Sequence, residues 1–262
     1  MNKLYRLLLL CLLLASVGAQ AQAPDFMWAK QSVGTTRSSI EHGRSVARDA
    51  TGNTYTTGSF GNYISFGSTM LTSSGTSDVS SGSTDIFIVK HDASGNTIWA
   101  QRAGGTSFDY GYGIALDASG NAYVTGSFQG TASFGNITLT SSGNNDIFVA
   151  KYDASGNVLW AQKAGGSSSD NGYGIAVDGS GNAYVTGSLQ GAASFGHISL
   201  TSRGYNDAFV AKYDASGNVL WAQRYGDSVE DYGYGISVDA SGNAYVTGWL
   251  FHGYSFFWKY HS

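Results

Sequence analysis

The sequence predicts an all-β fold, and three observations favour a β-propeller built from four-stranded antiparallel blades. The 262 residues include 37 glycines and one proline, and 12% of them are charged. This composition suits many strands joined by tight turns. A unit of 61 residues repeats along the chain. Each unit contains two pairs of short apolar runs with turn-forming residues between them, and four such strands per repeat are what a propeller blade requires.

The first 21 residues are typical of a secretory signal peptide. Lys3 and Arg6 precede the apolar run Leu7–Leu14, and small residues allow cleavage after Ala21. The apolar run is shorter than the ~20 residues that cross a bilayer, so we expect no transmembrane segment. We predict an exported protein in the periplasm, at the cell surface or outside the cell. The mature chain, residues 22–262, should form one propeller domain without cysteine.

The repeats follow in a simple order after cleavage. A lone strand is predicted at 25–33, and it contains Trp28. Repeat units begin at about residues 43, 111 and 172, and a partial unit occupies 233–262. The first unit is seven residues longer because a Ser/Gly/Thr-rich loop separates Thr72 from Asp85. These units add up to about four blades, of which the last is incomplete.

Within one unit, two hairpins define four strands. The first joins strand a, Gly-Ile-Ala-Val-Asp, to strand b, Ala-Tyr-Val-Thr-Gly. The second joins strand c, Phe-Val-Ala-Lys-Tyr, to strand d, Val-Leu-Trp-Ala-Gln. Both turns read Asp-x-Ser-Gly-Asn, whose Asn and Gly tolerate the left-handed backbone of a tight hairpin. Between b and c, Ser-Phe-Gly-x-x-x-Leu-Thr-Ser predicts a short extra hairpin.

Aromatic residues recur at fixed places in two strands. Tyr112, Tyr173 and Tyr234 alternate with glycine in strand a, so that a large side chain on one face can interlock with a neighbouring blade. The strand d tryptophans are Trp28, Trp99, Trp160 and Trp221. Their fixed place predicts packing between blades, and the alternative is a platform for sugars.

The C-terminus allows two alignments. In the 61-residue register, Ser255-Phe256 match Ser194-Phe195, and the chain ends before a strand c. Deleting 14 residues instead places Phe257-Trp-Lys-Tyr260 on strand c. We favour the gapless register, in which the chain resembles part of a longer propeller. The ring then closes imperfectly, with the N-terminal strand joining the C-terminal strands, or a partner completes it, and self-association is one such route.

These repeats resemble the SBBP family of bacterial β-propeller repeats. The matching text is Gly-Ile-Ala-Val-Asp-x-Ser-Gly-Asn-Ala-Tyr-Val-Thr-Gly, followed by Phe-Val-Ala-Lys-Tyr-Asp-Ala-Ser-Gly-Asn-Val-Leu-Trp. The resemblance covers residues 25 to about 256. It implies a propeller that is exported or lies on the cell surface, and it brings no agreed catalytic residues.

Two series of acidic residues are the candidate ligand-binding groups. The first precedes strand a by two residues and comprises Glu41, Asp109, Asp170 and Asp231. The second precedes strand c and comprises Asp85, Asp146 and Asp207. A meander places both series on the propeller face opposite the Asp-x-Ser-Gly-Asn turns. The first series predicts a ring of carboxylates at the channel mouth that binds a hard cation such as Ca²⁺, or a cationic ligand. The alternative is that each acid caps local backbone amides.

Composition and motifs narrow the function to binding. Asp and Glu (18) outnumber Lys and Arg (14), which argues against nucleic acid as a partner. The mature chain lacks a thiol, a Gly-x-Ser-x-Gly elbow and paired histidines with ligand spacing. We therefore predict a non-enzymatic binding or structural module with a protein or carbohydrate ligand.

Two alternatives stay open. A carbohydrate-active lyase or glycosidase would have to use the few residues that break the repeat, which are Glu41, His42, Arg44 and Glu230. The chain would otherwise be a truncated copy of a larger propeller, without a separate activity.

Overall fold

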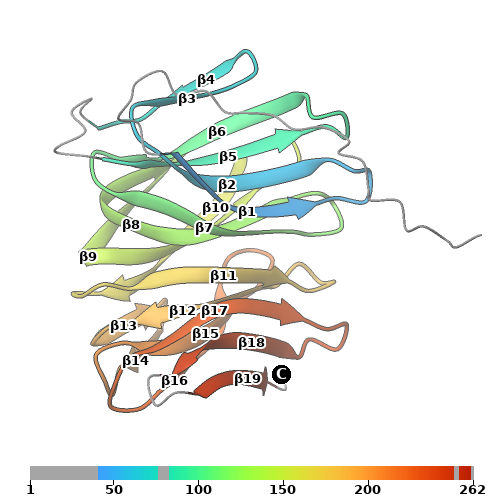
Figure 1. Ribbon diagram of the computed structural model, residues 1–262. Helices are drawn as coiled ribbons and strands as arrows, with labels where there is room; N and C mark the ends of the chain where they lie inside the picture. The colour runs from blue at the N-terminus through green and yellow to red at the C-terminus, as the bar shows by residue number, and fades with distance from the viewer. Residues whose placement is uncertain (1–40, 76–82, 251–253, 261–262) are drawn as a thin grey trace, which may run out of the picture.

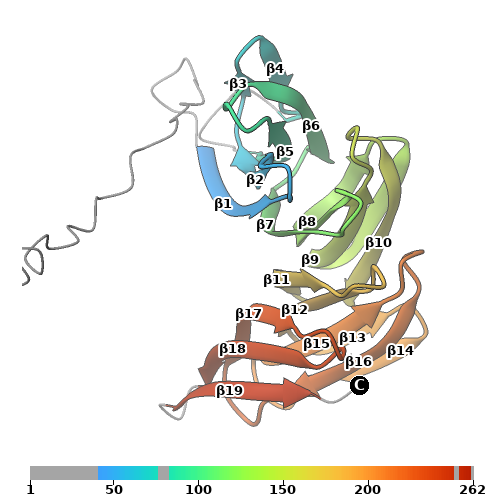
Figure 2. The same cartoon turned by 90° about the vertical axis from the view of Figure 1, so that its right-hand side faces the viewer.

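The computed structural model describes residues 41–75, 83–250 and 254–260. Within these ranges the chain forms strands and turns and no helix, which confirms the all-β prediction. The strands build four successive blades along an open arc, with blade 1 at one end and blade 4 at the other (Figure 1, Figure 2). None of the described segments is a helix able to cross a bilayer. The predicted signal peptide and the predicted strand at 25–33 lie outside the described residues.

Blades 1 to 3 follow the predicted strand order a, b, c, d, and the described residues of blade 4 form strands a, b and c. Blade 1 consists of β1 (Glu41–Arg48), β2 (Thr54–Phe60), β5 (Asp85–His91) and β6 (Thr97–Gly105). Blade 2 consists of β7 (Asp109–Leu116), β8 (Ala122–Phe134), β9 (Ile137–Tyr152) and β10 (Val158–Gly166). Blade 3 consists of β11 (Asn171–Val177), β12 (Ala183–Leu189), β15 (Asp207–Tyr213) and β16 (Val219–Tyr225). Blade 4 consists of β17 (Asp231–Val238), β18 (Ala244–Leu250) and β19 (Tyr254–Tyr260).

The Asp-x-Ser-Gly-Asn sequence makes the hairpin turns by local hydrogen bonding. Asp153 Oδ1 accepts the backbone N–H groups of Ser155 at 2.8 Å and Asn157 at 2.9 Å. The Asn157 side-chain amide donates to Asp153 Oδ2 at 2.9 Å. Gly156 follows with φ +87°, a conformation that favours glycine. These aspartates are structural elements of the turns.

The predicted extra hairpins are present, and two of the three join neighbouring blades. They are β3 (Tyr63–Phe66) with β4 (Thr69–Thr72), the distal ends of β8 and β9, and β13 (Ala192–Phe195) with β14 (Ile198–Thr201). Phe134 in the hairpin of blade 2 pairs with Ala103 of β6 in blade 1, and Phe195 of blade 3 pairs with Ala164 of β10 in blade 2. Each of these two hairpins therefore extends the sheet of the preceding blade.

The hydrophobic core lies between blades. The inner strands β1, β7, β11 and β17 are neighbours in that order around the arc (Figure 2). One buried cluster joins Tyr55 and Ile86 of blade 1 to Ile114 of blade 2, and a second cluster joins blades 2 and 3 in the same way. The strand a glycines were expected to face a strand a tyrosine of the neighbouring blade. The side chain that packs against the first strand a glycine of blades 2, 3 and 4 is instead a threonine from strand b of the preceding blade. The strand a tyrosines contact one another, edge-on between Tyr112 and Tyr173 and tilted between Tyr173 and Tyr234.

The strand d tryptophans bridge consecutive blades. Trp99 Nε1 donates to the carbonyl of Ala154 at 3.1 Å, and Trp160 Nε1 donates to that of Ala215 at 3.1 Å. Trp160 packs edge-on against Tyr123, with 6.0 Å between ring centroids. The structure thus places these rings at blade junctions and not on an open sugar platform. Trp28 lies outside the described residues.

The favoured alignment of the C-terminus is wrong. β19 pairs with β18 as a strand c, and Ala244 lies opposite Tyr260 just as Ala183 lies opposite Tyr213 in blade 3. The chain therefore follows the alignment with 14 residues deleted, and the deletion removes the extra hairpin. Pairing with the free edge of β18 forms a backbone ladder, which the gapless register would leave unmade.

Candidate functional site

The two acidic series meet in pairs at the blade junctions. Asp85 at the start of β5 lies beside Asp109 at the start of β7 in the next blade. Both border Gly104, which has φ +139°. A Cβ on this glycine would lie 2.7 Å from Asp109 Oδ2 and 3.2 Å from Asp85 Oδ1. The equivalent pairs are Asp146 with Asp170 at Gly165, and Asp207 with Asp231 at Gly226. Six of the seven candidate acids thus form three carboxylate pairs.

The acids of strand a cap backbone amides. Asp109 Oδ2 accepts the N–H of Gly105 at 2.7 Å, and Oδ1 accepts that of Gln129 at 3.3 Å. Asp170 accepts the equivalent groups of Gly166 at 2.8 Å and Gln190 at 3.0 Å. These bonds tie the loop before strand a to the end of strand b. The structure therefore agrees with the capping alternative at these two positions.

The acids of strand c have cationic partners on strand d. Arg102 contacts Asp85 at 2.5 Å, and Lys163 lies 3.6 Å from Asp146. The third acid, Asp207, pairs with Arg224. All of these carboxylates are buried. Each pair therefore combines two buried carboxylates with one cation, which leaves an excess negative charge to be neutralised.

In the first two pairs, the raised pKa values favour neutralisation by a proton at mildly acidic pH. Burial raises the pKa of Asp109 to about 7, with the Asp85 charge adding to the effect and the amide bonds opposing it. Burial raises the pKa of Asp170 to about 6, and Asp146 adds to it. Within the described structure, Oδ1 of Asp85 and Oδ1 of Asp146 are buried acceptors without a hydrogen-bond partner. Protonation of the neighbouring carboxyl group would add a donor beside each of these acceptors.

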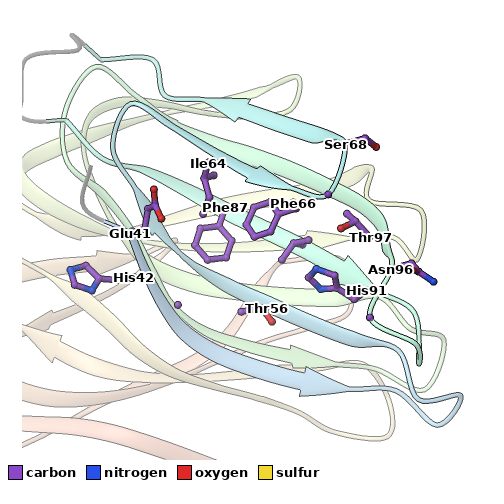
Figure 3. Close-up of a pocket in the computed structure, with 14 residues that line it drawn as sticks. Glu41, His42, Thr56, Ile64, Phe66, Ser68, Phe87, His91, Asn96 and Thr97 are labelled. Atoms are coloured by element: carbon purple, nitrogen blue, oxygen red, sulfur yellow. The ribbon is translucent and has the colours of Figure 1, made fainter. Parts of the chain in front are cut away.

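Glu41, the seventh candidate acid, lies in a different environment. It borders a cavity of about 570 Å³ in blade 1, together with His42, Phe66, Phe87 and His91 (Figure 3). In the described part of the chain, no group of three or more His, Cys, Asp or Glu residues is placed to hold a metal ion. The first series is therefore distributed over blade junctions and this cavity. Binding of Ca²⁺ by these acids stays a prediction.

A ribbon of aromatic rings follows the inner strands from blade 2 to blade 4. In order, it consists of Phe108, Tyr110, Tyr112, Tyr173, Tyr234, Tyr232 and Trp249. Successive ring centroids lie 5.3 to 6.3 Å apart. Arg44 extends the ribbon into blade 1, with its guanidinium 5.5 Å from the Tyr112 ring. Phe108, Tyr234 and Trp249 are 41%, 53% and 39% exposed.

The sequence repeat does not by itself reveal this ribbon of aromatic rings. Tyr112, Tyr173 and Tyr234 recur with the repeat, and this was the available signal. Their stacking depends on the spacing between inner strands, which the repeat alone does not reveal. We call the seven aromatic residues the aromatic ribbon.

The residues proposed for an enzymatic alternative do not converge. Glu41, His42 and Arg44 belong to β1 in blade 1, whereas Glu230 precedes β17 in blade 4. β1 and β17 lie toward opposite ends of the arc (Figure 2). A glycosidase would need two carboxyl groups flanking one bond, and these glutamates do not have that arrangement within the described arc.

Comparisons with known proteins agree with the blade repeat. The SBBP beta-propeller repeat model matches residues 98–127, 159–188 and 220–249. An uncharacterized WD repeat-containing protein of Acanthamoeba polyphaga mimivirus is 26% identical over 63% of this chain and 14% of its own length. The regulatory protein FlaEY of Caulobacter vibrioides is 27% identical over 61% of this chain and 18% of its own. This chain thus spans less than a fifth of either relative.

Two solved structures are also similar. A protein of unknown function from Bacteroides caccae has a TM-score of 0.41 at 12% identity, over 79% of this chain and 53% of that chain. The Pan2 WD40 domain of Neurospora crassa has a TM-score of 0.24 at 10% identity, over 79% of this chain and 86% of that chain.

Proposed function

Because this chain carries SBBP beta-propeller repeats, we propose that it is an exported, non-enzymatic binding module that holds a neutral polysaccharide on its aromatic ribbon. The observation that carries the proposal is the continuity of the ribbon across three blades. Ring after ring lies along the inner strands, and three of the seven are at least 39% exposed. Such a surface suits an extended ligand.

The chemistry of the ribbon favours sugars. Aromatic faces bury the apolar faces of pyranose rings, while a Tyr hydroxyl or a Trp N–H stays available for hydrogen bonding. The side chains of the ribbon carry no charge, and Arg44 is the cation that lies on it. A neutral polymer of repeating sugars therefore matches both the length and the polarity of the ribbon.

A catalytic role has less support. The buried carboxylate pairs are engaged with backbone amides and basic side chains, so a substrate would have to displace those contacts. Glu41 and Glu230 belong to different blades. Among the described residues, the acids named for a glycosidase or lyase therefore do not form an accessible pair, and binding without turnover is the better proposal.

We expect neutral hexasaccharides, cellohexaose and chitohexaose, to change the intrinsic fluorescence of the mature protein, because Trp249 lies on the ribbon. Replacing Tyr173 or Tyr234 by alanine should weaken binding about 2-fold to 12-fold, since each change removes an aromatic contact worth about 0.5–1.5 kcal/mol. The Tyr205→Ala variant is the control, because Tyr205 is 64% exposed and does not belong to the ribbon.

The same incubations test for catalysis. Recovery of both hexasaccharides at full length supports a binding module. Cleavage products that disappear in a Glu41→Gln or Glu230→Gln variant would favour the enzyme instead. Binding that is equal in the wild type and both ribbon variants would refute the ribbon as the site.

Export has its own test. We expect the protein recovered from the medium or the cell envelope to begin at Gln22, because the predicted cleavage follows Ala21. N-terminal sequencing measures this directly. Recovery of the chain with Met1 intact, and only in the cytoplasm, would contradict the export proposal.

A further inference from the structure

Neighbouring blades interlock through one repeated contact. A threonine of strand b points at a glycine of strand a in the following blade. A Cβ on that glycine would lie 2.4 Å from Thr57 Oγ1 at Gly111, 2.4 Å from Thr125 Oγ1 at Gly172 and 2.1 Å from Thr186 Oγ1 at Gly233. The three threonines are fully buried. At each interior junction, the preceding blade therefore contributes the threonine and the following blade contributes the glycine. We call the blade face that carries the threonine the forward face, and the blade face that carries the glycine the backward face.

The two ends of the arc carry the unmatched halves of this contact. Thr247 occupies the threonine position of blade 4, and it is exposed. Gly43 occupies the glycine position of blade 1, and among the described residues nothing lies within 4 Å of the place where its Cβ would be. Thr247 thus lies on the forward face of blade 4, and Gly43 lies on the backward face of blade 1. These two faces resemble the faces that are buried at every interior junction.

Apolar burial shows the same pattern. Ile114 and Ile175 pack against the preceding blade and are 6% and 8% exposed. The equivalent residue of blade 1 is Val46, which is 66% exposed. Val46 is therefore exposed at a position that is buried in blades 2 and 3, as expected where no described blade precedes it.

The cavity of blade 1 has the same origin. In blades 2 and 3, Phe134 and Phe195 of the extra hairpin pair with strand d of the preceding blade. Their counterpart is Phe66 of β3, which lines the cavity (Figure 3). In the described structure β3 pairs with β4 alone. The cavity therefore lies where a preceding blade would pack.

The row of strand a side chains that runs from Arg44 to Tyr234 has a cation at one end and an aromatic ring at the other. Tyr112, Tyr173 and Tyr234 follow one another around the arc, and Arg44 stacks on Tyr112 at the blade 1 end. Tyr234 at the blade 4 end is 53% exposed. Docking blade 4 of one copy against the backward face of blade 1 in a second copy would bring Tyr234 close to Arg44 of that copy. This would form a cation–π contact like the one between Arg44 and Tyr112.

We propose that two copies of this chain associate head to tail, with the forward face of blade 4 in each copy docked on the backward face of blade 1 in the other. The interface is heterologous, and two such contacts close a ring. Propellers have about four to eight blades. The four described blades of two copies add up to eight, whereas those of three copies would exceed this range.

Engineered disulfides test the contact directly. The mature chain has no cysteine, and a Cβ on Gly233 would lie 3.3 Å from Thr186 Cβ, close to the roughly 3.5–4.5 Å of a disulfide. Chains with Gly43→Cys should therefore cross-link to chains with Thr247→Cys when the two are mixed and oxidised. Either chain alone should stay largely uncross-linked.

The same disulfide distinguishes the competing forms of closure. A chain with both cysteines should give a product with the mass of two chains. A disulfide formed only within one chain would show that four blades close on themselves, and absence of cross-linking in the mixture would show that these faces do not meet. Both outcomes overturn the proposal.

Light scattering after size-exclusion chromatography supplies an independent measurement. We expect twice the chain mass for the wild type at all micromolar concentrations, and one chain mass for Gly43→Trp, whose ring would block the docking face. Gly179→Trp is the control, because Gly179 also has open space around it and lies in the a–b turn of blade 3. A wild-type monomer, a mass that grows with concentration, or a dimer unaffected by a folded Gly43→Trp variant would refute the closed ring.

Discussion

Replacing Trp160 by alanine is expected to lower the free energy of unfolding by about 3–5 kcal/mol. Trp160 is 9% exposed, and its Nε1 donates to the Ala215 carbonyl of the next blade at 3.1 Å. Its ring also packs edge-on against Tyr123 and lies under Gly217, where a Cβ would come within 2.8 Å of it. The substitution leaves a cavity at the junction of blades 2 and 3 and removes one hydrogen bond. Equilibrium denaturation in urea measures the change.

The neighbouring residue is a matched control. Leu159 lies in the same strand, β10, but is 51% exposed. Leu159→Ala should change the free energy of unfolding by less than about 1 kcal/mol. Equal losses in both variants would show that the effect comes from strand propensity and not from the blade junction. A loss below about 1 kcal/mol for Trp160→Ala would contradict the bridging role of the ring.

The carboxylate pairs predict that the fold becomes less stable as pH rises from 5 to 8. The pKa of Asp109 is about 7 and that of Asp170 about 6 in the folded protein, against 3.8 without burial. The native state therefore binds more protons than the unfolded chain in this range, and each raised pKa contributes stability at low pH that is lost as pH rises through the folded value. The expected loss for both groups is on the order of 3–4 kcal/mol.

Asp109→Asn should remove about 2–3 kcal/mol of this pH dependence, because asparagine keeps the shape and cannot ionise. At pH 5 the variant should be modestly less stable than the wild type, because an amide has one acceptor oxygen, whereas Asp109 uses both of its oxygens to accept the N–H groups of Gly105 and Gln129. Urea denaturation at pH 5 and pH 8 gives the four free energies. Subtracting the variant from the wild type cancels the titration of the histidines.

Asp153→Asn is the control for this series. Turn hydrogen bonds, chiefly from Asn157, lower the pKa of Asp153, so its contribution is lost only as pH falls through the acidic range and should be constant between pH 5 and 8. If Asp109→Asn keeps the full pH dependence of the wild type, the protonated-pair description is wrong.

Calcium provides the last arm of the experiment. If an acid pair binds Ca²⁺, millimolar calcium at pH 8 should raise the melting temperature of the wild type more than that of Asp109→Asn. An equal response in both proteins, or none, would refute a calcium site at this pair and leave its carboxylates as structural groups.

The carboxylate pairs could be predicted only in part from the sequence. Asp85 and Asp109 could each be placed next to a strand and on one face of the propeller, because strand order in a meander follows chain order. Their contact could not be predicted, since it joins strand c of one blade to strand a of the next. The repeat shows that Asp109 and Asp170 are equivalent. It does not show whether the acids that precede strand a contact one another or contact the acids that precede strand c.

The sequence by itself determined the repeat, the four strands of a blade and the turns between them. These features depend on local chemistry, as in the Asp153 turn, where acceptor and donors lie within four residues of one another. Tertiary structure alone decided the carboxylate pairs, the aromatic ribbon, the pairing of β19 with β18 and the open faces at Gly43 and Thr247. Each of these depends on the distance and rotation between neighbouring strands or blades, which follow from the packing of many buried side chains at once.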